Sequence, residues 1–155
     1  MDHLWTKFWQ KIKSLRVSLK IALKYGIAAT IVIAVWVALK NFVLHFEGPA
    51  AQGADFVIFN GSALIALFMG IREKRAVNGG SLSFGDGLGT GVSIAITYSL
   101  LLSLYFAVLL LLVGPRLMQQ AGHTSYVSAF AGLFIGMVVF GAIFSAVISL
   151  ILRRS

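Results

Sequence analysis

The chain contains no cysteine, only two prolines and only five acidic residues among 155. Without cysteine there is no disulfide, thiolate metal site, cysteine nucleophile or thioether-linked haem. The acidic residues avoid the middles of the apolar runs and stand at Asp2, Glu47, Asp55, Glu73 and Asp86. Proton pumps and many ion-coupled transporters need an ionisable group near the bilayer midplane, so these classes are disfavoured.

Charge is scarce altogether, and what there is has one predominant sign. Charged residues make up 12% of the chain and hydrophobic ones 59%, whereas soluble domains carry roughly 25% charged residues. The net charge is +8. Because the basic residues gather at the ends of apolar runs, we expect the partner to be anionic lipid headgroups and not nucleic acid.

Four long apolar runs predict an all-α polytopic membrane protein with transmembrane helices over residues 23–46, 55–72, 86–113 and 125–152. The second run is short unless its helix continues inward through the basic residues 72–75. Ser83 and Asp86 stand three apart before the third run and fit a capping box. Gly114-Pro115 closes that run, because proline cannot extend a helix without losing a hydrogen bond.

Residues 1–22 form a separate feature ahead of the four-helix domain, which we assign to residues 23–155. At 100° per residue the segment places Trp5, Phe8, Trp9 and Ile12 on one face and most of its lysines outside it. This pattern predicts a basic amphipathic helix lying on the inner leaflet. The alternative is a plain extension of the first transmembrane helix.

All 13 Lys and Arg residues except Lys40 and Arg116 fall on one side of the predicted bundle. The positive-inside rule then places both termini and the 72–83 loop in the cytoplasm. The basic residues expected to set topology or to meet lipid headgroups are Lys7, Lys11, Lys13, Arg72, Arg75, Arg153 and Arg154.

Glycines spaced four apart predict close helix packing, because they let a neighbouring backbone approach in a bilayer. The candidates are Gly85 with Gly89, in a stretch that also holds Gly87 and Gly91, and Gly132 with Gly136. The partner helix would belong to this bundle or to another protein. The stretch lacks the glycine and lysine spacing of phosphate-binding loops.

The residues from Gly70 to Pro115 resemble an uncharacterised bacterial membrane family, known as domain of unknown function four-one-nine-nine. The resemblance rests on Arg72 and Arg75, then Asn78-Gly79-Gly80, then Leu82-Ser83-Phe84-Gly85, and Tyr105 in the following helix. It implies about four membrane segments with a basic, glycine-bearing loop between the second and third, and, because the family is bacterial, a location in the bacterial inner membrane. The family has no assigned activity, so the resemblance implies no catalytic residue.

The remaining polar residues give only weak candidates. His45 and His123, with Glu47 and Asp55, should lie at the outer face and form a conceivable divalent-metal set, although independent interfacial residues are the simpler interpretation. Asn60 and the third-run hydroxyls (Ser93, Thr97, Ser99 and Ser103) would line a polar path or bond within their helices.

The sequence therefore predicts a non-enzymatic membrane protein without a cofactor, since no nucleophile–base pair can be named. We expect an accessory or interaction subunit that contacts other transmembrane helices, as a homo-oligomer or in a hetero-complex. The alternative is a small oligomeric transporter or channel, with Asn60 and the hydroxyls along its path.

Overall fold

The computed structural model describes residues 2–113 and 125–154, and within these ranges every regular element is a helix. The elements are α1 (Asp2–Ala38), a π-helical continuation η1 (Leu39–Leu44), α2 (Pro49–Val77), α3 (Phe84–Val113) and α5 (Tyr126–Arg154). The predicted all-α class is confirmed. Pro115, Arg116 and His123 lie outside the described residues.

Four helices are long and apolar enough to cross a membrane, with spans Ser14–Leu44, Pro49–Val77, Phe84–Leu111 and Phe130–Arg153. The second is longer than its apolar run. It begins with Pro49 in the first turn, where the missing N–H costs no helical bond, and it continues through the basic residues to Val77. The first passes Lys40 and Asn41 without a break, because the chain widens there into the π-helix η1.

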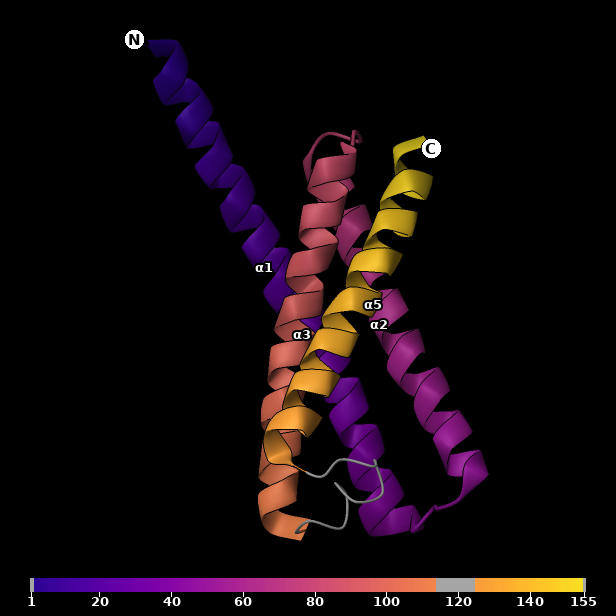
Figure 1. The fold of residues 1–155 in the computed structure, drawn as a ribbon. Helices are drawn as coiled ribbons and strands as arrows, with labels where there is room; N and C mark the ends of the chain where they lie inside the picture. The colour runs from indigo at the N-terminus through magenta and orange to yellow at the C-terminus, as the bar shows by residue number, and fades with distance from the viewer. Residues whose placement is uncertain (1, 114–124, 155) are drawn as a thin grey trace.

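The third transmembrane helix, α3, contacts each of the other three, and its interface with α5 is the most extensive. Both chain ends lie at one end of the bundle, together with the α2–α3 connection, and residues 45–48 lie at the opposite end (Figure 1). This agrees with the predicted placement of both termini on one side.

Small residues repeated every fourth position form the seam between α3 and α5. Gly87 faces Ser149, Gly91 faces Ser145, and Ala95 faces Gly141. A Cβ built on Gly87 would lie 2.9 Å from the Cβ of Ser149, closer than real Cβ atoms approach. The two antiparallel backbones therefore lie near enough that these positions have no space for larger side chains.

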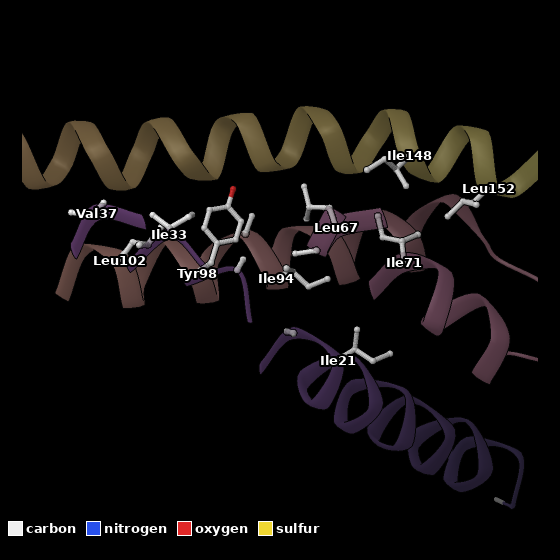
Figure 2. Packing of buried hydrophobic residues seen from close by; sticks show 14 of the residues in the cluster. Ile21, Ile33, Val37, Leu67, Ile71, Ile94, Tyr98, Leu102, Ile148 and Leu152 are labelled. Atoms are coloured by element: carbon white, nitrogen blue, oxygen red, sulfur yellow. The ribbon is translucent and has the colours of Figure 1, made fainter. Parts of the chain in front are cut away.

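The core lies on both sides of this seam and draws on all four transmembrane helices. Figure 2 shows Ile94, Tyr98 and Leu102 of α3 between side chains of the neighbouring helices. The phenol of Tyr98 is 3% exposed and donates a hydrogen bond to the carbonyl of Met137, 3.1 Å away. Buried aromatic rings of this kind fix the depth at which the helices pack, because the hydroxyl needs a partner.

The connection between α2 and α3 is built from two local capping motifs. Gly79 and Gly80 have positive φ angles of 74° and 88°, and their N–H groups bond the carbonyls of Ala76 and Arg75, which is a Schellman ending. At the other side, Ser83 Oγ accepts from the backbone N–H of Asp86 at 3.1 Å and donates to its carboxylate. The predicted N-cap at Ser83 is confirmed, with the Asp86 carboxylate bonded to the Ser83 hydroxyl, and α3 starts at the next residue, Phe84.

The amphipathic N-terminal segment is not a separate element, since α1 runs without interruption from Asp2 to Ala38 across the predicted boundary at residue 22. Ile21 and Ala22 are buried in the core, and Ser14 contacts α2. The bundle therefore begins earlier than residue 23. Beyond it the same helix projects away from α3 (Figure 1), with Trp5 60% and Trp9 54% exposed.

Candidate functional site

The strongest polar contacts in the described residues tie α1 to α2 at two levels. At one end, the ammonium of Lys40 and the indole N–H of Trp36 both donate to the carboxylate of Asp55, at 2.6 and 2.8 Å. At the other, Glu73 accepts from Lys24 at 2.7 Å and from the phenol of Tyr25 at 2.6 Å.

These two clusters mark the two boundaries of an apolar layer. The residue spacing between Lys24 and Lys40 on α1, and between Asp55 and Glu73 on α2, corresponds to about 24 and 27 Å of helix. A bilayer core is roughly 30 Å thick. The charged side chains therefore sit where the headgroup regions would begin, and each carboxylate meets a cation from the neighbouring helix.

Lys74 is a buried cation that the sequence analysis counted only as a loop charge. It is 1% exposed, and its ammonium bonds the carbonyl and the hydroxyl of Ser14 at 3.2 and 3.0 Å. The signal was its position three residues after Ile71 and seven after Leu67, both fully buried on the same face of α2. Lys74 connects the start of the bundle portion of α1 to the C-terminal end of α2.

The basic residues predicted to meet lipid divide into several groups. Arg72 and Arg153 are exposed at the end of the bundle that holds both termini. Arg75 is half-buried and donates from Nε to the carbonyl of Gly80 at 2.9 Å, so it also stabilises the loop. The side chains of the remaining ones lie outside the described part of the structure: Lys7, Lys11, Lys13 and Arg154.

Three of the four predicted packing glycines make no close contact with the described residues, whereas two glycines interleaved with the first pair do. A Cβ on Gly85, Gly89 or Gly136 would meet nothing within 4 Å, whereas Gly87 and Gly91 lie against α5. For contacts inside this bundle the choice of Gly85 and Gly89 is corrected to Gly87 and Gly91, because the second pair lies on the α5-facing side of α3. The possibility of a partner from another protein stays a prediction.

Two of the four α3 hydroxyls predicted to line a path bond their own helix. Ser93 and Thr97 each donate to the carbonyl four residues earlier, at 2.8 Å. The buried hydroxyls of Ser99 and Ser103 have no hydrogen-bond partner among the described residues. This arrangement gives the intrahelical interpretation direct support at two of the four positions.

Gly132, Gly136 and Asn60 meet at a feature that the sequence did not predict, a cleft of about 260 Å³ between α2 and α5. Tyr98 of α3 and Ile33 of α1 also line it. Gly136, predicted to pack against a helix, borders open space here, since a Cβ on it would meet nothing within 4 Å.

The outer-face metal set is not assembled in the part of the chain that the structure describes. Asp55 is engaged by Trp36 and Lys40, and no group of three His, Asp or Glu side chains lies close enough to hold an ion among the described residues. His45 ends η1 with a left-handed φ of 47°, and His123 lies outside the described ranges.

Comparison with known proteins adds a family and no activity. Residues 24–124 match the family described as Protein of unknown function (DUF4199), which covers the second half of α1, α2 and α3 and stops before α5. No curated protein and no solved structure matches the chain. The matched range contains both ionic clusters and the capped α2–α3 connection. Since the match spans well over half of the chain, this membrane protein belongs to the DUF4199 family.

Proposed function

We propose that the chain is a non-catalytic subunit of the bacterial inner membrane that associates with another transmembrane helix through the outward face of α3. The observation that carries this proposal is the free glycine pair, Gly85 and Gly89, with open space where each Cβ would stand. The same face continues through exposed Ile96, Leu100 and Leu104, at four-residue spacing. Such a face suits a helix that packs closely at the glycines and by apolar contact beyond them.

A small transporter is the second candidate and has weaker support. It needs a polar path along α3, whereas Ser93 and Thr97 satisfy their hydroxyls within the helix. Asn60 belongs to α2 and lies in a cleft between α2 and α5. Ser93 and Thr97 belong to α3 and do not line this cleft. The described residues therefore support the interaction subunit better than the transporter.

The association is tested by purifying the tagged full-length chain from native membranes in mild detergent. We expect a stoichiometric partner that is lost in Gly89→Leu and retained in Gly61→Leu, because Gly61 also borders open space but lies on α2. Both variants should melt like the parent chain. Retention of the partner by Gly89→Leu, or a chain that purifies as a homo-oligomer alone, would contradict the subunit proposal; the second result would lead to flux assays in liposomes.

Orientation is part of the proposal, with both termini and residues 78–83 in the cytoplasm. Because the chain has no cysteine, single cysteines report topology without background. We expect a membrane-impermeant maleimide to label Glu47→Cys from the outside of intact spheroplasts, and Ser81→Cys only after permeabilisation. Both positions are exposed. The reverse labelling pattern would place the termini outside the cell and would contradict the orientation predicted by the positive-inside rule.

A further inference from the structure

The cleft between α2 and α5 arises because these two helices contact each other at one end of the bundle and separate toward the other. Leu67 and Ile71 of α2 belong to the same buried core as Ile148 and Leu152 of α5. Nearer the outer end the two helices diverge (Figure 1), and the cleft of about 260 Å³ lies there.

The depth of the cleft restricts what can reach it. Asn60 comes five residues after Asp55 on α2, which is about 8 Å along the helix from the ionic boundary. Its position between the two charged levels places it within the apolar layer of the membrane. A ligand in the cleft is therefore a molecule already dissolved in the bilayer.

The size of the cleft favours a small occupant over a helix. A helix with its side chains is about 10 Å across and needs a long groove of that width. Cavities that hold small ligands have volumes from about 300 Å³ upward, close to the volume of this cleft. A volume of about 260 Å³ thus fits one hydrocarbon chain or one small ring. The lining is suited to such a group, since Phe59, Phe140 and Phe144 border the cleft and a Cβ on Gly136 would meet nothing within 4 Å.

The single side-chain amide in the lining defines the polar end of the ligand. Asn60 Nδ2 lies 2.7 Å from the carbonyl oxygen of Phe56. Because that oxygen can only accept, the atom facing it must be the amide nitrogen, and Oδ1 is left as an acceptor. No described residue donates a hydrogen bond to Oδ1 of Asn60. Tyr98 cannot serve, since its hydroxyl donates to Met137.

The charge of the lining defines the ligand further. None of the described residues that border the cleft is charged. A carboxylate or phosphate headgroup would enter an apolar layer without a counter-ion, at a cost of several kcal/mol. The ligand is therefore neutral and carries a hydrogen-bond donor.

We propose that this cleft binds a neutral lipid with a free hydroxyl group, of the long-chain alcohol type, with its hydroxyl donating to Asn60 Oδ1 and its chain against the three phenylalanines. This proposal is independent of the α3 face, because the cleft lies between α2 and α5. A second protein copy or a segment of another protein would be a different occupant, and the experiment separates these cases.

The test uses the full-length chain in nanodiscs with a diazirine-bearing hexadecanol as the probe. We expect photolabel in α2 and α5 next to the cleft, competed by unlabelled hexadecanol and at least fivefold more weakly by hexadecane or palmitate. Gly136→Leu fills the cleft and should reduce labelling about tenfold. Asn60→Leu removes the acceptor and should reduce it about fivefold, as expected for the loss of one hydrogen bond.

Gly61→Leu is the matched control, because it adds the same side chain to open space beside Asn60 without entering the cleft lining. It should label like the parent chain, and all three variants should keep the parent melting temperature. Label that persists in Gly136→Leu, equal competition by hexadecane, or a disulfide between two copies of Gly136→Cys in place of labelling would each overturn the proposal.

Discussion

Replacing Gly91 by leucine should destabilise the bundle by about 3 kcal/mol or more, whereas Gly89→Leu should leave its stability unchanged. A Cβ on Gly91 would already lie 2.5 Å from the Cβ of Ser145, and two backbones at this distance cannot accept four more carbons. Gly89 is two residues away on the same helix and its Cβ would meet nothing within 4 Å. Thermal melting of the purified chain should show a loss of roughly 10 °C for the first variant.

A compensating pair of substitutions can show that the contact between Gly91 and Ser145 causes this loss of stability. Gly91→Ala should lower the melting temperature on its own, and Ser145→Gly in the same chain should recover most of the loss, because the second change removes the atoms that the new methyl group meets. A coupling energy of about 1 kcal/mol is expected for groups in direct contact. Equal melting temperatures for Gly91→Leu and Gly89→Leu would show that α3 and α5 do not pack along this seam.

Replacing Asp55 by leucine should cost about 2 kcal/mol, between the values typical of exposed and of buried ion pairs. The change leaves the ammonium of Lys40 and the indole N–H of Trp36 without their acceptor at the edge of the apolar layer. The Lys40 and Asp55 side chains are only 19% and 29% exposed, so water replaces the lost contact poorly. Denaturation in mixed micelles measures the difference.

The second ionic cluster provides the control for this prediction. Glu73→Leu removes the partner of Lys24, whose side chain is 61% exposed, and the acceptor of the Tyr25 phenol, so the loss should be smaller than for Asp55→Leu. Adding Lys40→Met to Asp55→Leu should restore much of the stability, because it removes the uncompensated charge. A double variant no more stable than Asp55→Leu would mean that the charge of Lys40 is not what makes the single change costly.

The proposals for the α3 face and the cleft can be separated by the same set of variants. Gly89→Leu changes only the outward face of α3, and Gly136→Leu changes only the cleft. A partner lost in the first with lipid labelling intact, and labelling lost in the second with the partner intact, would establish two independent sites. Membership of the DUF4199 family predicts neither, because the family carries no assigned activity.

The sequence by itself determined the features that depend on neighbouring residues along the chain. Hydropathy gave four spanning helices, the Ser83–Asp86 cap gave the start of α3, and the distribution of lysine and arginine predicted both termini at one end. Each of these follows from local geometry or from transfer of a segment into lipid, so no knowledge of the other helices is needed.

Only the tertiary structure decided which face of each helix points inward. In a helix of a soluble protein the polar side faces the solvent. Lipid and the bundle core are equally apolar, so polarity does not show which side of α3 faces inward. The sequence therefore could not distinguish the pair Gly85 and Gly89 from the pair Gly87 and Gly91. The inward-facing pair is the one that contacts Ser145 and Ser149 of α5 across the seam. The burial of Lys74, the pairing of Asp55 with Lys40 and the cleft beside Asn60 arise in the same way, because each requires two helices distant in sequence to meet at one level of the membrane.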